Sequence, residues 1–594
     1  MNWSEVLLSS LQWILQSLLI VSIVFTLIFS LLVKTTDWAS QFWRLAQPYL
    51  SVKKNWRPFA YFWVIIFFNL ISVRLDILFS EWYNAMYTSL QEMNVTVFWQ
   101  QMIVFSLLAT VHVCNVLLTY YISQRFTIQW RTWLNQHYLD KWIKNQAYYK
   151  TQYGITQLDN PDQRIQQDIE SYISRSLSFA TGVISSSVSL VAFTLILWNL
   201  SGPMAILGIE IPHMMVFLVF TYVLITSLIA FRIGRPLIKL NFANERLNAN
   251  YRYSLIRLKE YAESIAFYRG EKMEQNLLVQ QFNRIIGNIW QLIYRTLKLS
   301  GFNLVVSQVS VIFPLLIQAV RYFNQQIKLG DLMQTAQAFG KVESALSFYR
   351  NAYDDFAAYR AVLDRLTGFQ TAIEQASQPT KIQLHQTNGP LQVENLTIQT
   401  PNGNILLENL TLNLQQGDYL LIQGDSGVGK TTLLRSLAGL WPYAEGTVSY
   451  PTEQALFLSQ KPYLPQGRLI DSLYYPALAD ENVDFTSIEQ IMQQVNLGHL
   501  SDRLEQENDW TRVLSLGEQQ RLAFARLLLH KPQIAFLDEA TASMDEGLED
   551  AMYRLIRTAL PNTTIISVGH RSTLLKHHAL QLKILPTKKW VLLK

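Results

Sequence analysis

The run Gly424-Asp425-Ser426-Gly427-Val428-Gly429-Lys430-Thr431 decides the fold of the C-terminal part of the chain. It matches G-x-x-x-x-G-K-[ST], follows an apolar segment (419–423) and precedes a helical pattern (432–440). Glycines let backbone N–H groups close around phosphate oxygens at the start of a helix. We therefore expect Gly424 to Thr432 to bind a nucleotide, with Lys430 at the β and γ phosphates and Thr431 as a ligand of Mg²⁺.

An acidic segment supplies the second part of this chemistry. Ile534-Ala535-Phe536-Leu537 reads as a buried strand, which ends in Asp538 and Glu539. The strand delivers Asp538 to its carboxyl end, where the carboxylate can hold Mg²⁺ through water. Glu539 is placed to orient and deprotonate the attacking water. Since Glu539 is present, we expect ATP hydrolysis as well as binding.

Further motifs occur in a fixed order around these two. They are Gln460 in Leu458-Ser459-Gln460-Lys461-Pro462, the run Leu514-Ser515-Leu516-Gly517-Glu518-Gln519-Gln520-Arg521, Ser543-Met544-Asp545, and His570 after a strand pattern, 564–568. Together the motifs resemble the ATPase of ABC transporters. The resemblance implies that Ser515 and Gly517 bind the γ-phosphate of ATP held by an opposite subunit. It also implies that Gln460 senses Mg²⁺ and contacts the membrane domain, and that His570 grips the γ-phosphate.

Two positions depart from the family pattern. The signature reads LSLGE where LSGGQ is common, so Leu516 replaces a glycine. The aromatic residue that stacks on adenine should fall near Thr400, just before Pro401, and it is missing. The second departure puts base selectivity, rather than phosphate chemistry, in question.

The N-terminal half is predicted to cross a membrane. Of all 594 residues, 50% are hydrophobic and only 16% are charged, against about 25% charged in typical soluble proteins. A span takes about 20 mostly apolar residues, and six stretches qualify: Leu11–Val33, Phe59–Ser80, Gln101–Ile122, Leu177–Leu200, His213–Phe231 and Phe302–Val320. The first is too long for a signal peptide and has no basic residue before it, so we expect an uncleaved anchor.

Loop charges give an orientation. Lys and Arg concentrate in 34–57, 123–176 and 232–299, whereas 81–98 and 201–212 contain neither. Cytoplasmic loops retain basic residues, so the N-terminus is expected outside; only Arg321 and Lys328 oppose this orientation. A cytoplasmic ATPase then requires a seventh crossing by Asp331–Ala352, although its apolar residues recur every third position as in a soluble amphipathic helix. The net charge of +5 and the lone Cys114 argue against nucleic-acid binding and against disulfides.

Arg74 and Asp76 lie within the second span and allow two interpretations. Both side chains can reach water near the outer end of the helix. Alternatively, they face an interior substrate path. The sequence leaves both open.

The expected fold is a polytopic α-helical membrane domain of the ABC exporter type, with six core helices and one extra N-terminal helix, followed by an α/β P-loop ATPase. The expected boundaries are an N-terminal helix and basic linker, 1–58, a transmembrane domain, 59–370, a linker, 371–390, and an ATP-binding domain, 391–594. Asn160–Asp168 and Glu263–Glu271 resemble cytoplasmic loops of peroxisomal (subfamily D) half-transporters. Among bacterial relatives the chain resembles the YddA-like and SbmA/BacA-like group.

This resemblance implies an ATP hydrolase coupled to transport in the bacterial inner membrane. Its partners would be a second copy of itself, membrane lipid and the transported substrate, with ATP and Mg²⁺ as cofactors. Relatives associated with peptide and cobalamin uptake favour import of peptide-like or other hydrophilic cargo. Three alternatives are an exporter or lipid and fatty-acyl translocator, a proton-coupled carrier with a regulatory ATPase, and a membrane sensor that transports nothing.

Overall fold

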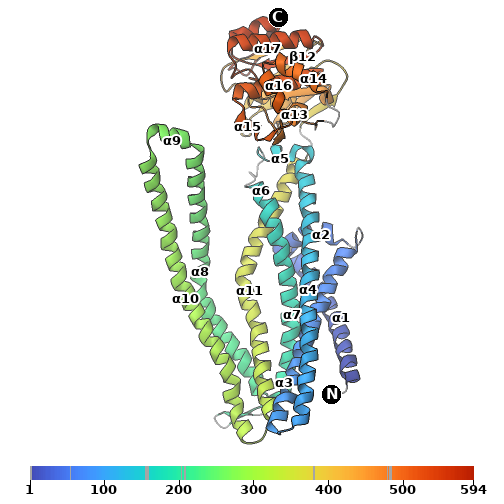
Figure 1. Ribbon diagram of the computed structural model, residues 1–594, viewed down its shortest axis with the longest axis vertical. Coiled ribbons are helices and arrows are strands. Elements are labelled where there is room, and N and C mark those ends of the chain that lie inside the picture. The colour runs from blue at the N-terminus through green and yellow to red at the C-terminus, as the bar shows by residue number, and fades with distance from the viewer. Residues whose placement is uncertain are drawn as a thin grey trace. The chain divides into compact units, whose positions relative to one another are not determined.

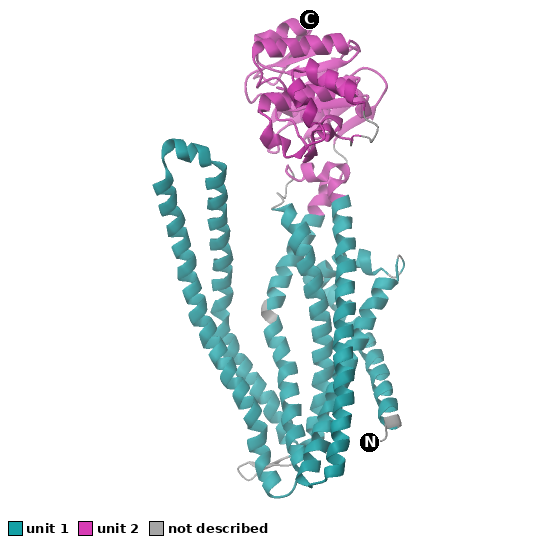
Figure 2. Cartoon of the chain, viewed as in Figure 1, with its two compact units in different colours: residues 1–140, 160–370 teal, residues 141–159, 371–594 magenta. Residues whose placement is uncertain are grey.

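The computed structural model describes residues 3–51, 53, 55–153, 160–202, 204–206, 209–378, 381–477, 479 and 484–593. Each of the four expected domains, 1–58, 59–370, 371–390 and 391–594, includes a few residues outside these ranges. The chain forms two compact units, coloured separately in Figure 2. The first consists of Met1–Asp140 and Asn160–Gln370, and the second of Lys141–Asp159 and Thr371–Lys594.

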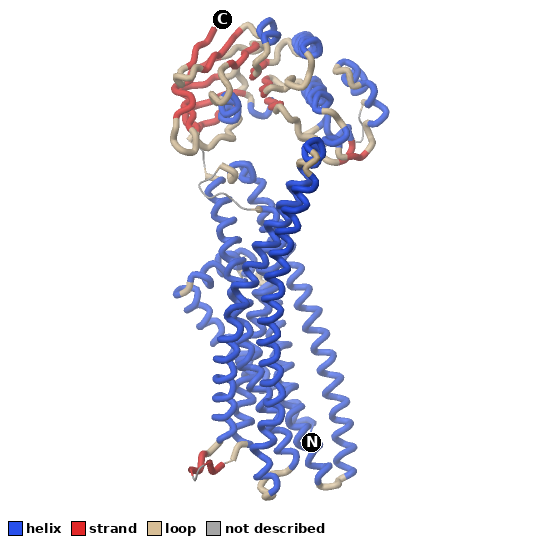
Figure 3. Tube along the Cα trace, turned by 90° about the vertical axis from the view of Figure 1, so that its left-hand side faces the viewer, coloured by secondary structure: helices blue, strands red, loops and turns tan. Residues whose placement is uncertain are grey.

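The first unit is a bundle of long helices, drawn from blue to yellow-green in Figure 1. Its main helices are α1 (Trp3–Thr35), α2 (Asp37–Leu50), α3 (Arg57–Gln91), α4 (Val95–Ile143), α7 (Ile169–Leu200), α8 (Met214–Glu260), α10 (Glu271–Phe323) and α11 (Leu329–Ala376). Among the described residues, six helices are long and apolar enough to cross a membrane; five contain a predicted span in full, and the helix from Met214 contains all of His213–Phe231 but its first residue. The hairpin β1 (Met204–Ile206) and β2 (Ile209–Ile211), red at the base of Figure 3, joins α7 to α8.

The amphipathic segment 331–352 lies in α11, a single helix of 48 residues. Its apolar stripe is buried in the bundle: Ala338, Phe339 and Val342 pack in one cluster with α7 and α8 side chains, among them Phe193 and Met215. Polar groups nearer the start of the same helix contact α3, where Asn84 Nδ2 donates to Asp331 and to the buried Gln334. The period-three pattern therefore marks a helix of the membrane bundle, not a separate soluble helix.

The two charges of the second span face different neighbours. Asp76 forms an ion pair with Lys341 of α11, with 2.7 Å between carboxylate oxygen and Nζ. Arg74 instead points toward α1, where its Nε donates to Ser10 Oγ at 3.1 Å. Asp76 is therefore paired with another helix of the bundle, and Arg74 with α1.

The predicted cytoplasmic loops are extensions of the membrane helices. The helices α8 and α10 pack along each other and are connected by the short α9 (Ala262–Tyr268), forming an arm that leaves the rest of the bundle in Figure 1. At its tip, Phe267 and Tyr268 are 80% and 88% exposed. Large aromatic side chains at such exposure are typical of a surface that contacts another protein.

The second unit contains the sheets. The six-stranded sheet has the order β14-β13-β6-β12-β11-β8, with β14 (Trp590–Leu593) antiparallel to β13 (Leu580–Ile584) at one edge. The other four strands, all parallel, are β6 (Tyr419–Gln423), β12 (Thr564–Val568), β11 (Ile534–Asp538) and β8 (Ala455–Leu458). A four-stranded sheet has the order β3-β7-β4-β5, formed by Ile382–Gln386, Ala444–Tyr450, Gln392–Gln399 and Ile405–Asn413.

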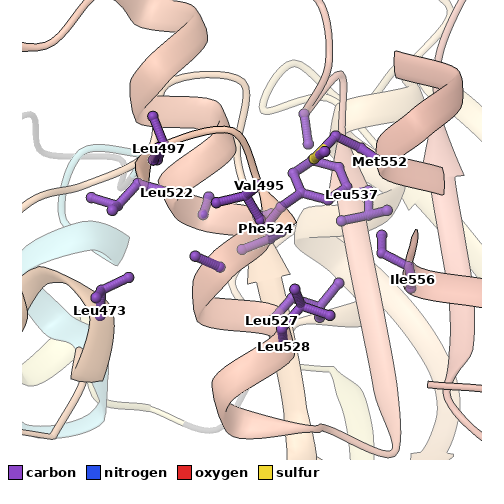
Figure 4. Close-up of a cluster of buried hydrophobic side chains, with 14 of the residues drawn as sticks. Leu473, Val495, Leu497, Leu522, Phe524, Leu527, Leu528, Leu537, Met552 and Ile556 are labelled. Carbon is purple, nitrogen blue, oxygen red and sulfur yellow. The ribbon is translucent and has the colours of Figure 1, made fainter. Parts of the chain in front are cut away.

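Helices complete the second unit around a large apolar cluster. The longest, α12 (Lys430–Leu437), α14 (Phe485–Gln494), α16 (Leu516–His530) and α17 (Glu546–Ala559), are accompanied by the short α13 (Leu469–Tyr474) and α15 (Trp510–Val513). Figure 4 shows α16 in the middle of this cluster, with Phe524 on the side of Leu537 of β11 and Met552 of α17, and Leu522 on the opposite side, next to Leu497. This cluster holds the N-terminus of α16 in place relative to the sheet.

Two boundaries differ from the expected domains. The stretch 371–390 includes the last residues of α11 and strand β3, which pairs with β7. The segment Lys141–Tyr153, expected inside the transmembrane domain, belongs to the second unit. There the Tyr153 ring lies 5.1 Å from that of Trp441, and the Tyr443 hydroxyl donates to the Tyr153 carbonyl at 2.6 Å.

A buried histidine makes the stability of the second unit depend on pH. His578 is 4% exposed and lies against Ser567 and the Leu574 carbonyl, and burial lowers its pKa from 6.5 to about 4. The unfolded chain therefore takes up a proton at higher pH than the folded chain. As the pH falls from about 6.5 to about 4, we expect a loss of about 3 kcal/mol of unfolding free energy from this group.

The His578→Phe variant is expected to flatten this pH dependence. Thermal unfolding of the full-length protein, followed between pH 7 and pH 5, measures the difference from wild type. The matched control is His530→Phe, at an exposed histidine of the same unit. If the stability of wild type and of His578→Phe depended on pH in the same way, the lowered pKa of His578 would be contradicted.

Candidate functional site

The predicted site residues of the second unit lie at the carboxyl ends of the parallel strands of the six-stranded sheet. Neighbouring parallel strands β6, β12, β11 and β8 have these ends side by side. The phosphate loop follows β6, His570 follows β12, Asp538 ends β11 with Glu539 directly after it, and Gln460 follows β8. Parallel α/β sheets bind ligands outside the carboxyl ends of their strands. The sheet order thus brings together residues that are up to 146 positions apart in sequence.

The phosphate loop has the backbone that its glycines suggest. Gly427 and Gly429 adopt φ angles of +82° and +104°, which side chains other than glycine rarely adopt. Lys430 begins α12, and its Nζ donates to the carbonyls of Gly424 and Asp425 at 2.9 Å each. Burial lowers the pKa of Lys430, although Glu539, Asp425 and Asp538 oppose this shift. The loop is therefore closed around a buried lysine.

Oxygen ligands suited to a magnesium ion meet beside this loop. The Thr431 hydroxyl donates to Asp538 Oδ1 at 3.2 Å. Burial raises the pKa of Asp538, while Thr431 and the nearby cations lower it. A hydroxyl and a carboxylate in contact match the hard oxygen donors that Mg²⁺ prefers. The donor set of Thr431 and Asp538 therefore fits the ion.

Glu539 is the centre of the remaining contacts. Its two carboxylate oxygens face Gln460 Nε2 at 3.1 Å and His570 Nε2 at 3.5 Å. The residue itself has φ +49°, a conformation uncommon for side chains other than glycine, asparagine and aspartate. Its backbone N–H donates to the Val568 carbonyl, so neighbouring strand β12 holds this turn in place. Glu539 thus contacts both of the other residues predicted to be catalytic.

The signature residues form a well-defined helix start. Ser515 is the N-cap of α16 and forms a capping box with Glu518, whose carboxylate accepts from both the N–H and the hydroxyl of Ser515. A Cβ on Gly517 would lie 3.1 Å from the Ser543 carbonyl, so glycine suits the close approach here. Among the described residues, no hydrogen bond or ion pair links Ser515 or Gly517 to the phosphate loop.

Gln520 is a functional candidate that sequence reasoning did not single out. It is fully buried, its Nε2 donates to the Gln460 carbonyl at 2.8 Å, and its Oε1 accepts from the Ser543 N–H at 3.0 Å. One side chain therefore joins the signature helix to the loops that carry Gln460 and Ser543. Its place in the signature run was a signal, but the two contacts depend on the tertiary fold.

The Gln520→Ala variant is expected to lower the ATP turnover number about 10- to 100-fold and to leave ATP affinity nearly unchanged. Each buried group left without its partner costs about 1–3 kcal/mol, here through displaced loops. Phosphate release at saturating ATP measures the turnover number. Gln519→Ala is the matched comparison, because that buried side chain bonds to the Thr511 and Leu514 carbonyls instead. Equal losses in both variants would refute a positioning role for Gln520.

The region of the missing aromatic residue is a tight turn. The Thr400 N–H donates to the Asn404 carbonyl at 2.8 Å, and the turn connects β4 to β5. Just after this turn, Leu406 lies beside Gly429. A Cβ added to Gly429 would lie 3.4 Å from the Leu406 Cβ. An aliphatic side chain thus borders the loop near the position where an aromatic ring was expected.

One polypeptide therefore combines a nucleotide-hydrolysing unit with helices that cross a membrane, and this defines a membrane transporter driven by nucleotide hydrolysis. Family models agree: ABC transporter transmembrane region 2 matches residues 45–323, and ABC transporter matches residues 407–542. The chain belongs to the ABC transporters. It is a half-transporter that binds ATP and couples ATP hydrolysis to transport, and it is a multi-pass inner-membrane protein with a cytoplasmic ATPase.

Relatives confirm the resemblance found in the motifs. An uncharacterized ABC transporter ATP-binding protein of Haemophilus influenzae is 59% identical, covering 100% of both chains. The inner membrane ABC transporter ATP-binding protein YddA of Escherichia coli is 33% identical, over 89% of this chain and 94% of its own. The human lysosomal cobalamin transporter ABCD4 is 29% identical, over 81% of this chain and 82% of its own.

A solved structure shares the fold. The bacterial Atm1-family ABC exporter with ATP bound superposes with a TM-score of 0.67 at 16% identity, covering 90% of this chain and 94% of that one. The expected exporter-type membrane fold followed by an α/β ATPase is thereby confirmed.

Proposed function

We propose that the chain acts as a homodimer and imports peptide-like or other hydrophilic cargo across the bacterial inner membrane. The observation that carries the cargo class is the polar lining of α11 inside the membrane bundle. There Lys341 is paired with Asp76, and Asp331 and Gln334 are bonded to Asn84. Charged groups within a membrane bundle usually mark a polar path.

In this proposal each ATP is bound by two subunits. Gly424 to Thr432 of one subunit hold the phosphates, with Thr431, Asp538 and Gln460 as the residues that would hold Mg²⁺. Ser515 and Gly517 come from the second copy, as the resemblance of the signature motif to ABC transporters implies. When bound, Mg²⁺ would offset the negative charge of the β and γ phosphates. Glu539 is the base, oriented by Gln460, and His570 contacts the γ-phosphate.

Lys430 contributes a buried positive charge to this arrangement. Its ammonium group is now held by the carbonyls of Gly424 and Asp425. Phosphate oxygens are stronger acceptors for an ammonium group than neutral carbonyls, since the hydrogen bond joins opposite charges. The lysine therefore gains by exchanging these carbonyls for the nucleotide, and the exchange favours the ATP-bound state.

Two contact points would transmit closure of the ATPase dimer. The first is Tyr153, clamped in its own ATPase unit by Trp441 and Tyr443. The second is α9 at the tip of the long arm, where Phe267 and Tyr268 are exposed in the single chain. We place this tip against the ATPase of the second copy. ATP drives closure only as far as it binds the closed dimer more tightly than the open one.

Uptake into right-side-out membrane vesicles loaded with ATP tests the proposal. The panel contains short peptides, cobalamin and acyl-CoA, each added outside. We expect uptake of a hydrophilic compound by wild type and none by Glu539→Gln. Net efflux would overturn import, and acyl-CoA as the only cargo would favour a fatty-acyl translocator. Uptake that survives Glu539→Gln and collapses with the proton gradient would identify a proton-coupled carrier.

A further inference from the structure

A long apolar groove separates α1 from the rest of the bundle. It has a volume of about 560 Å³. Side chains from one face of α1 and one face of α7 form its two walls, with Trp38 and Phe42 of α2 and Phe356 and Tyr359 of α11 at one end. From Trp13 to Leu32 the α1 wall extends about 28 Å at 1.5 Å per residue. That is close to the bilayer core thickness of about 30 Å.

The groove has a packed floor and a fixed wall. Ile66 and Leu70 of α3 are fully buried beneath it, in one cluster with Ile184 of α7. The α7 wall is held against α11 at Gly182, where an added Cβ would lie 2.6 Å from the Phe348 ring. Since α1 packs on α2 and α3 and leaves α7 across the gap, the groove is part of the fold.

A positive charge stands at the outer end of this groove. The Arg74 guanidinium lies 5.9 Å from the centre of the Trp13 ring, and Trp13 lines the groove. Arg74 donates from Nε to Ser10, and the Glu81 carboxylate of the same helix interacts electrostatically with its guanidinium. Its remaining N–H groups suit a phosphate, which guanidinium binds through paired hydrogen bonds.

We propose that the groove between α1 and α7 binds one anionic phospholipid of the outer leaflet. Its phosphate pairs with Arg74 and one acyl chain lies between the walls. The groove runs along a helix that spans the membrane, where acyl chains surround the protein. This position favours a lipid as its occupant. The charge at Arg74 selects an anionic headgroup. The bound lipid fills the gap between the extra N-terminal helix and the core.

Native mass spectrometry of the delipidated full-length protein tests this site. The probes are phosphatidylglycerol and phosphatidylethanolamine with identical acyl chains. Wild type is expected to retain one phosphatidylglycerol per chain, about tenfold tighter than phosphatidylethanolamine because of the charge-assisted pair with Arg74. Arg74→Gln removes this preference, whereas Arg74→Lys keeps most of it.

Groove-filling variants separate the acyl site from general lipid contact. Val183→Trp and Val24→Trp place a large ring in the groove at partly exposed positions, one on each wall. The matched control is Leu118→Trp, at an exposed position of α4 outside the groove. We expect loss of retained phosphatidylglycerol in the first two and wild-type retention in the third. Unchanged retention in Val183→Trp would overturn the proposal. Loss of the dimer mass without loss of lipid would assign the groove to a second copy and also overturn it.

Discussion

Glu539→Gln is expected to lower the rate of ATP hydrolysis by about 10²–10⁴-fold, the usual contribution of a positioned general base. The amide cannot accept the proton of the attacking water. The phosphate loop, Thr431 and Asp538 stay intact, so ATP binding should persist. The variant should therefore hold ATP with its two ATPase units closed. Phosphate release measures the rate, and retention of radiolabelled ATP after gel filtration measures trapping.

Two features of the site sharpen this expectation. The amide of glutamine keeps an oxygen that can accept from Gln460 Nε2, so the loop after β8 should remain in place. The contact with His570 loses its charge. Glu489→Gln, at an exposed position on α14, serves as the control for the same chemical change away from the site. Hydrolysis by Glu539→Gln at more than about a tenth of the wild-type rate would refute the base assignment.

Activity should return when two inactive variants are combined. Lys430→Ala removes the phosphate-binding ammonium group, and Gly517→Asp puts a carboxylate where the γ-phosphate is expected to bind. Each homodimer should be inactive. In a mixed dimer, however, the phosphate loop of the Gly517→Asp subunit meets the signature of the Lys430→Ala subunit, and both of these are intact. Purified mixed dimers should then hydrolyse ATP at about half the wild-type rate, with one complete site of two.

This complementation distinguishes a shared site from one within a single chain. If each site used the loop and signature of the same polypeptide, neither subunit of the mixed dimer would contain a complete site, and no activity would return. Two different affinity tags, applied in sequence, isolate the mixed dimer. The control is a subunit that carries both substitutions, paired with itself. It should stay inactive whichever arrangement is correct.

The nucleotide site could largely be predicted from sequence because its residues follow strands. The phosphate loop with Lys430, the acidic pair at Asp538 and the loop with His570 each follow a strand pattern, and parallel strands place their carboxyl ends side by side. Gln520 could not be found in this way. It lies inside the signature helix, and its two partners are backbone groups of loops that meet only after the sheet and helices have packed.

The membrane half was harder to predict for a different physical reason. Hydropathy identifies helices that face lipid, and it therefore found the six spans. It undervalued α11, because a helix buried among other helices can keep polar groups that pair with its neighbours, as Lys341 does with Asp76. The direction of Arg74 depended on the position of α1, which no local pattern reveals.

The docking of Lys141–Tyr153 in the second unit has a consequence for modularity. The ATPase is assembled from two separate stretches of chain, so a fragment that begins at Thr371 lacks part of its own fold and leaves the Tyr153-facing sides of Trp441 and Tyr443 uncovered. When the ATPase of one relative replaces that of another, the segment Lys141–Tyr153 therefore has to be exchanged together with it. Recombination at 371–390 alone would create a chimaera in which the contacts of Tyr153 with Trp441 and Tyr443 join residues from two different proteins.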